Sequence, residues 1–200
     1  MNDRSPEHIR PLLVRIDRLM AERERVLVAI DGGSASGKTM LGALLQSIYA
    51  CPVFHMDDFF LRPEQRTPER FSEPGGNVDR ERFLSEVLLP LREGKTVDYR
   101  RFDCKTFTIA SPRRIEPGRL NIIEGAYAMH PDLAPYYDLT VFLVVSAEKQ
   151  RERILKRNAP AQAELFFDRW IPFEQRYFAA LNVPERCDLT IFLDDQTSVP

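Results

Sequence analysis

The chain has 200 residues, of which 44% are hydrophobic, and this composition suits one globular domain with a sizeable core. Its 28 basic and 30 acidic residues give a formal net charge of −2, which argues against a nucleic-acid-binding protein with a broad basic surface. The three cysteines form no CxxC pair, so neither a zinc site nor a disulfide framework is expected.

The N-terminal segment is dense in charged residues and has no apolar core of the kind found in signal peptides. No apolar run approaches the roughly 18 residues that cross a membrane. We therefore expect a cytoplasmic protein that has neither a membrane nor a nucleic acid as its partner.

In chain order, apolar residues at helical spacing first predict an amphipathic helix within residues 1–25. A buried strand is predicted at 26–30 and a helix at 39–49. Leu41, Leu44, Leu45 and Ile48 are expected on the inward face of that helix. A second strand is predicted at 52–55. Residues 61–78 are rich in proline and show no period, so they are predicted to form a long loop.

The second half of the chain continues this alternation. A helix is predicted at 79–93, a β-hairpin or extended excursion at 96–109, and strands at 120–123 and 139–145. Ser146 is placed to cap a basic helix at 148–157. A further helix over about 161–181 and a last strand at 189–193 complete the pattern.

Apolar strands that alternate with helices predict an α/β fold, with a parallel sheet covered on both faces. In such sheets, ligands bind at the carboxyl ends of the strands. Three predicted strand ends carry polar clusters, which read DGGSASGKT, MDDFF and EG. We expect the functional site where these clusters meet.

The first cluster matches the phosphate-loop pattern GxxxxGK[ST] in full, between a predicted strand and a predicted helix. Glycines let the backbone N–H groups of such a loop point at phosphate oxygens, and the following helix adds the positive end of its dipole. Lys38 is predicted to reach the β- and γ-phosphates of ATP, and the Thr39 hydroxyl to ligate Mg²⁺. The predicted nucleotide-binding residues are Gly32, Gly33, Ser34, Ala35, Ser36, Gly37, Lys38 and Thr39.

A phosphate loop alone does not separate kinases from GTPases or ATP-driven machines. A kinase also needs a group that positions and deprotonates the acceptor hydroxyl. Asp57 and Asp58 follow the second strand, and their spacing alone leaves open which one is the base or whether the pair caps a loop. Glu124 ends a buried strand and is predicted to support Mg²⁺ or the acceptor hydroxyl, with a surface turn as the alternative.

The basic helix at 148–157 places Arg153 and Arg157 four residues apart and therefore on one face. Arginines there are able to close over a triphosphate and neutralise charge in the transition state. A solvated basic face is the alternative for such a run.

Together these segments resemble the uridine kinase family of P-loop kinases, which includes proteins similar to nicotinamide riboside kinases. GGSASGKT, HMDDFF, NIIEGAY and YDLTVFLVVSAEKQRERILKR are similar to successive elements of that family, over residues 26–193. The resemblance implies one P-loop kinase domain over 1–200, with a five-stranded parallel sheet, helices on both faces and a short helical lid at 146–160.

The resemblance also implies roles for individual residues. Asp57, rather than Asp58, takes the place of the catalytic aspartate, and Asp79 that of an aspartate that holds ribose hydroxyls. Asp79 also stands where a helix N-cap is expected. Arg153 and Arg157 take the places of lid arginines.

This chain departs from the family at the segment that reads the base. Phe102 and Asp103 stand where the uridine kinases carry Tyr-Asp, so Phe102 is predicted to contact the substrate, but no histidine follows. His55, just before the Asp pair, either faces the pocket or lies in the core. The predicted loop carries three arginines that either meet an anionic acceptor or solvate the loop: Arg62, Arg66 and Arg70.

The sequence therefore predicts an ATP- and Mg²⁺-dependent kinase that phosphorylates a hydroxyl of a nucleoside-like small molecule. Nicotinamide riboside, a pantothenate-like alcohol or a sugar phosphate is the alternative acceptor. A nucleotide-binding switch or ATPase module is the alternative from a different functional class. The oligomeric state is left open, a homo-oligomer included.

Overall fold

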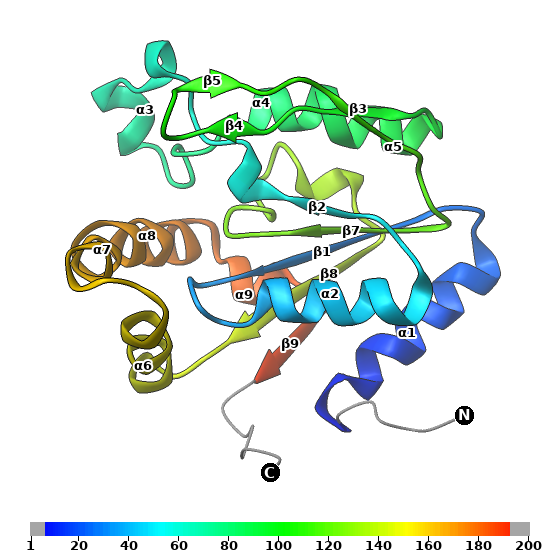
Figure 1. Ribbon diagram of the computed structural model, residues 1–200. Helices are drawn as coiled ribbons and strands as arrows, with labels where there is room; N and C mark the ends of the chain where they lie inside the picture. Colours follow the sequence, from blue (N-terminus) through cyan, green and yellow to red (C-terminus); the bar gives the residue numbers. More distant parts are fainter. Residues whose placement is uncertain (1–6, 193–200) are drawn as a thin grey trace.

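Five parallel strands form the central sheet, in the order β2-β7-β1-β8-β9 (Figure 1). The computed structural model describes residues 7–192. The strands are β1 (Val26–Gly32), β2 (Val53–His55), β7 (Leu120–Glu124), β8 (Leu139–Val144) and β9 (Leu189–Phe192). β1 lies at the centre and every one of its residues is buried, as a strand covered on both faces requires. The predicted α/β class and the five strands are confirmed.

Helices cover both faces of this sheet. Those in the first half of the chain are η1 (Glu7–Ile9), α1 (Arg10–Glu22), α2 (Lys38–Tyr49), η2 (Met56–Asp58), η3 (Pro63–Gln65), α3 (Pro68–Ser72), α4 (Arg80–Phe83), η4 (Leu84–Leu88) and α5 (Leu89–Glu93). Those in the second half are η5 (Ala134–Tyr136), α6 (Ala147–Arg157), α7 (Pro160–Leu165), η6 (Phe166–Trp170), α8 (Ile171–Leu181) and α9 (Val183–Arg186). Within the described residues, none of them combines the length and the apolar character needed to cross a membrane.

The alternation along β1 divides the core into two layers. Val26, Val28 and Ile30 pack with α1 and α2 on one face of the sheet. Leu27 and Ala29 pack on the other face with α4, α5, α8 and α9. Successive side chains of a strand point to opposite faces, so one apolar strand serves both layers.

Several predicted elements differ from the structure. In α2, Leu41 and Leu45 are buried as expected, but Ile48 is 44% exposed, so its inward placement is wrong. Residues 61–78, predicted as one long loop, contain two short helices, η3 and α3. α3 is capped by the Thr67 hydroxyl, which accepts from the Arg70 N–H, so local capping stabilises a turn that has no apolar period.

The predicted excursion at 96–109 is also more elaborate. β3 (Val97–Tyr99) pairs with β6 (Arg113–Ile115), and β4 (Phe102–Asp103) pairs with β5 (Thr108–Ile109). The partner of β3 thus lies outside the predicted segment, and a small nested hairpin results. Two sequence predictions extend beyond the described residues: the start of the N-terminal helix, at 1–6, and the end of the last strand, at Leu193.

The sheet order defines the neighbourhood of the site. β2, which precedes the Asp pair, does not lie beside β1, because β7 is hydrogen-bonded between them. The carboxyl ends of β2, β7 and β1 are nevertheless consecutive along one edge, and α6, α7 and α8 lie at this end of the sheet (Figure 1). The three polar clusters therefore meet, with Glu124 in the middle.

Candidate functional site

The turn between β1 and α2 has the backbone of a phosphate-binding loop. Gly32 has a φ of 146°, and a Cβ there would lie 2.6 Å from the carbonyl oxygen of Leu143. Gly37 has a φ of 106° at the N-cap of α2, which has no side-chain cap. The first N–H groups of a helix have no partner within it, so this helix end offers free donors and a positive dipole to an anion.

The buried carboxylate of Asp31 connects the phosphate loop to two other segments of the chain. Asp31 accepts hydrogen bonds from the N–H groups of Gly32 (2.6 Å) and Met129 (2.9 Å) and from the Tyr177 hydroxyl (2.8 Å). Burial raises the pKa of Asp31, against these hydrogen bonds, which lower it. Asp31 thus joins the loop to the segment after β7 and to α8, a role that the sequence did not indicate.

The ammonium of Lys38 lies over its own loop. Its Nζ donates to the carbonyl oxygens of Gly32 (2.8 Å) and Gly33 (2.9 Å). These carbonyl groups hold the ammonium beside the end of α2. The arrangement fits the predicted role of Lys38 at a triphosphate, since the charge stays at the mouth of the loop.

Thr39, Glu124 and His55 form a polar chain next to the loop. The Thr39 hydroxyl donates to Glu124 Oε1 over 3.2 Å, and His55 Nδ1 lies 2.5 Å from the same oxygen. The hydrogen bond to Glu124 raises the pKa of His55, against its burial, and this favours an imidazolium–carboxylate pair. The side chain of His55 is 38% exposed, so it does not lie in the core, and its predicted place facing the pocket remains a prediction.

These residues also fit Mg²⁺. No cluster of three or more histidine, cysteine or acidic side chains suited to a metal occurs in the described part of the chain. Mg²⁺ bound with a nucleotide does not need one, because phosphates and waters complete its octahedron around one or two protein oxygens. The Thr39 hydroxyl and the Glu124 carboxylate lie next to each other here and would supply that pair of oxygens, so their predicted role at Mg²⁺ remains a prediction.

The two neighbouring aspartates have different environments. Asp58 is buried, and its carboxylate accepts from the Tyr99 hydroxyl (2.7 Å) and from Arg101 Nε (2.8 Å). Asp57 is exposed to solvent and lines the large cavity described below. The surrounding protein still displaces enough water to raise the pKa of Asp57, and the carboxylates of Glu124 and Asp58 add to this effect, whereas Lys38 opposes it.

A cavity of about 370 Å³ lies between the phosphate loop, the Asp57 turn and the helices α7 to α8. Ser34 and Asp57 are on its walls, together with aromatic side chains that include Tyr127 and Trp170. Tyr127 is held at a φ of 76°, a backbone conformation that bulky residues rarely adopt. Strained residues of this kind concentrate at functional sites. We name this space the acceptor cavity.

The lid helix α6 contacts the loop directly. Arg153 Nη1 donates to the Ala35 carbonyl oxygen (3.1 Å), and Gln150 Nε2 donates to that of Ser34 (2.7 Å). Arg157 lies over the ring of Phe166, 5.3 Å from its centroid, and Phe166 lines the acceptor cavity. Arg153 is therefore brought to the loop, whereas Arg157 sits one helical turn away.

Glu174 of α8 makes a second contact with the loop. Its carboxylate accepts from the Ser34 N–H (2.8 Å) and the Ser34 hydroxyl (2.6 Å). Burial raises the pKa of Glu174, while Lys38 and the two bonds from Ser34 lower it. Neither Glu174 nor Gln150 was predicted as a site residue. In the sequence, the one signal for Glu174 is that it is an acidic residue within an aromatic-rich segment.

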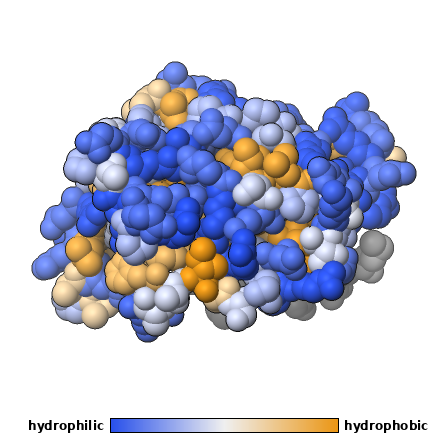
Figure 2. Space-filling view, turned by 90° about the horizontal axis from the view of Figure 1, so that it is seen from above, coloured by the Kyte–Doolittle hydropathy of each residue, from blue (hydrophilic) through white to orange (hydrophobic). Residues whose placement is uncertain are grey.

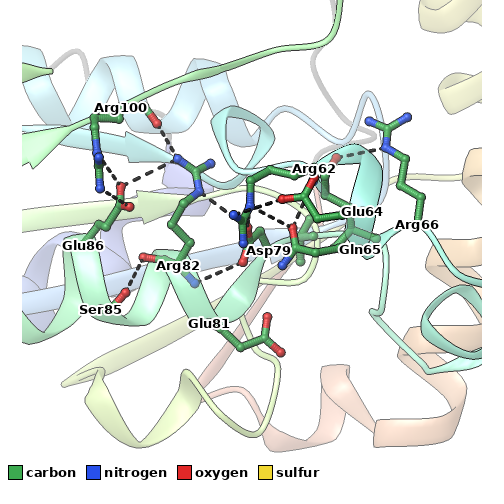
Figure 3. Close-up of polar contacts among 12 residues, drawn as sticks. Arg62, Glu64, Gln65, Arg66, Asp79, Glu81, Arg82, Ser85, Glu86 and Arg100 are labelled. Atoms are coloured by element: carbon green, nitrogen blue, oxygen red, sulfur yellow. Dashed lines mark hydrogen bonds and ion pairs between the residues drawn. The ribbon is translucent and has the colours of Figure 1, made fainter. Parts of the chain in front are cut away.

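Asp79 and Phe102 lie outside the acceptor cavity. Asp79 is the N-cap of α4, where it accepts from the Arg82 N–H, and it also pairs with Arg62 (Figure 3). Its N-cap role is confirmed, and these contacts already occupy its carboxylate. Phe102 is buried and lies under Arg66, 5.8 Å from ring centroid to guanidinium carbon. Their predicted contacts with a substrate remain predictions.

A known protein family matches most of this chain. The model of the Phosphoribulokinase / Uridine kinase family matches residues 27–161. Uridine kinase-like protein 4 of Arabidopsis thaliana is 27% identical over 146 residues, which cover 68% of this chain and 31% of the plant protein. This chain thus spans about a third of that relative. The uridine kinase of Chloroflexus aurantiacus is 29% identical over 143 residues, which cover 66% of this chain and 68% of that protein.

Solved structures show the same fold. A possible uridine kinase from Bacillus stearothermophilus superposes with a TM-score of 0.64 at 23% identity, and the match covers 90% of this chain and 98% of the other. The match extends well beyond the segment that the family model covers. The shared fold therefore includes more of the chain than residues 27–161.

Proposed function

Because the chain belongs to the phosphoribulokinase / uridine kinase family, we propose that it transfers the γ-phosphoryl group of Mg·ATP to a hydroxyl group of a small molecule. The observation that carries this proposal is the shared cavity. Ser34 of the phosphate loop and the solvent-accessible carboxylate of Asp57 lie on the walls of the same space. A nucleotide-binding switch has no need of such a carboxylate opposite its phosphate loop.

In this proposal the loop and the first turn of α2 hold the triphosphate, and Lys38 offsets charge on the transferred group. Thr39 and Glu124 would hold Mg²⁺, which would neutralise the charge that develops on the phosphate groups. Arg153 reaches the nucleotide from the lid at 146–160, and Arg157 follows it when the lid closes. These contributions are positioning and electrostatics, without a covalent enzyme intermediate.

Asp57 is the proposed base that accepts the proton of the acceptor hydroxyl. Three observations favour it over Asp58: Asp57 faces the cavity, desolvation raises its pKa, and no hydrogen bond occupies its carboxylate in the described residues. Asp58 is engaged by Tyr99 and Arg101 and instead fixes the turn.

The acceptor is proposed as a nucleoside-like alcohol, with nicotinamide riboside, a pantothenate-like alcohol and a sugar phosphate as further members of the panel to be tested. A cytoplasmic location is part of the proposal. The test is ADP formation with Mg·ATP against this panel, with the Lys38→Ala variant and excess EDTA as controls. ADP formation that depends on an acceptor, and that is lost both in Lys38→Ala and in the presence of EDTA, would support a kinase. Acceptor-independent hydrolysis alone would favour the ATPase or switch alternative.

A further inference from the structure

A second, smaller cavity of about 210 Å³ adjoins the acceptor cavity. The two share part of their walls, at Phe60, Asn77, Cys104 and Trp170. One elongated ligand is therefore able to occupy both. The smaller cavity has two arginines in its wall, Arg66 and Arg169, and no acidic residue.

Arg66 differs from the other arginines of its segment. Arg62 pairs with Glu64 and Asp79, and Arg70 pairs with Glu81. The guanidinium of Arg66 instead points away from the Asp79 network (Figure 3) and donates through Nε to the Leu61 carbonyl oxygen (2.9 Å). Among residues 7–192 no carboxylate lies within ion-pairing distance of Arg66.

Arg66 is also held in place by aromatic rings. Its guanidinium carbon lies 4.9 Å from the centroid of Phe107 and 5.8 Å from that of Phe102. Cation–π contacts restrain an arginine without neutralising its charge. The positive charge is thus fixed at the wall of the cavity, and its remaining N–H groups stay available to a ligand.

Arg169, in η6, has the same character. Its guanidinium carbon lies 4.9 Å from the centroid of Trp170 and 5.5 Å from that of Phe71, and Trp170 and Phe71 also line the smaller cavity. Within the described residues it has no carboxylate partner either. The face of the molecule that carries α3 and the hairpins is largely hydrophilic in Figure 2.

We propose that the smaller cavity binds an anionic group of the acceptor, a carboxylate or a phosphate, through Arg66 and Arg169. This inference rests on the proposed kinase function and, among the acceptors proposed above, favours the anionic alcohols over the neutral nucleosides. Asp57 in the neighbouring cavity repels an anion, while the two arginines attract it. The acceptor therefore binds in one orientation, with its anionic end at the arginines and its hydroxyl at Asp57.

The experiment compares matched acceptors that differ in one anionic group: pantothenate with pantothenol, and fructose 6-phosphate with fructose, with uridine as a neutral nucleoside. The first pair tests a carboxylate and the second a phosphate. We measure kcat and KM by ADP formation for the wild type and for Arg66→Gln, Arg169→Gln and Arg114→Gln. Arg114 is an exposed arginine on β6 that lines neither cavity, and it serves as the matched control.

An anionic acceptor is expected to exceed its neutral counterpart in kcat/KM by at least tenfold. Loss of one charge-assisted contact should raise its KM by about tenfold to a hundredfold in Arg66→Gln and in Arg169→Gln. The KM of ATP and all parameters of Arg114→Gln should stay within about twofold of the wild type. Equal use of the neutral partner, or an unchanged KM in both arginine variants, would overturn the proposal.

A binding measurement separates this proposal from the kinase function itself. Protein saturated with Mg²⁺ and a non-hydrolysable ATP analogue is titrated calorimetrically with each anionic compound and its neutral partner. If no compound is phosphorylated, the proposed function fails, yet binding of an anionic compound that both Arg66→Gln and Arg169→Gln weaken would uphold the anion site. Absence of any such arginine-dependent binding would remove it.

Discussion

The carboxylate of Glu174 accepts hydrogen bonds from the backbone N–H of Ser34 (2.8 Å) and from its hydroxyl (2.6 Å), although the two residues are 140 positions apart in the chain. Gln150 of the lid helix donates to the carbonyl oxygen of the same serine. One residue of the phosphate loop is therefore held by two helices from the far end of the chain. The conformation of the loop and the position of the lid are coupled through it.

We expect Glu174→Ala to lower the free energy of unfolding by about 2 kcal/mol, because two hydrogen bonds to a largely buried carboxylate are lost. Glu174→Gln should lose much less stability, since its amide oxygen still accepts from the Ser34 N–H and its amide nitrogen donates to the Ser34 hydroxyl. Urea denaturation measures both, with Glu164→Ala, an exposed glutamate of α7, as control. An alanine variant as stable as the wild type would show that Glu174 does not secure the loop.

Substitution of Asp57 and of Asp58 should have different effects on the protein. Asp57→Asn is expected to leave ATP binding within about twofold and to reduce kcat by about 10²- to 10⁴-fold, since it removes the proposed base. Asp58→Asn should mainly destabilise the protein, because it weakens the contacts to Tyr99 and Arg101. Steady-state kinetics, nucleotide titration and thermal melts distinguish these effects. Wild-type turnover in Asp57→Asn would exclude it as the base.

The lid arginines should differ in importance. Arg153→Gln is expected to reduce kcat by about 10²- to 10³-fold, because Arg153 already contacts the loop that holds the triphosphate. Arg157→Gln should have a smaller effect on kcat, since its guanidinium packs on Phe166. Saturating kinetics with Mg·ATP compare the two. A larger loss for Arg157→Gln would mean that lid closure exchanges their positions.

His130 predicts a pH-dependent stability. Burial lowers the pKa of His130 to about 4, and Arg80 adds to this, whereas Asp132 opposes it. Its Nδ1 accepts from the Asp132 N–H, which requires the neutral ring. As the pH falls from about 6.5 to about 4, His130 becomes protonated in the unfolded chain but stays neutral in the native protein. The free energy of unfolding therefore decreases over that window.

The loss due to His130 should be at most about 3 kcal/mol. In His130→Asn the side-chain oxygen still accepts from the Asp132 N–H but does not titrate. The difference in unfolding free energy between variant and wild type should therefore shift in favour of the variant as the pH is lowered from 7 to 4. Urea denaturation at several pH values measures this difference. A constant difference across that range would contradict the assignment.

Much of the architecture follows from local pattern. The apolar runs predicted all five strands of the sheet, and the spacing of Gly32 and Gly37 marked the phosphate loop. These features depend on residues adjacent in the chain: strand burial needs an apolar run, and the loop needs glycines at positive φ. The short helix α3 was missed because the Thr67 cap that stabilises it carries no hydrophobic period.

Tertiary structure decided the rest, because it depends on which distant segments meet. The sequence alone did not place β7 between β2 and β1, separate the buried Asp58 from the cavity-lining Asp57, or bring Glu174 to Ser34. Tertiary structure also decided which arginines are paired with carboxylates. Arg62, Arg66 and Arg70 look alike in sequence, and only the fold supplies carboxylates to the first and last while leaving Arg66 on aromatic rings beside a cavity. Hydrogen bonds and ion pairs act over a few ångströms in space, and separation along the chain does not reveal them.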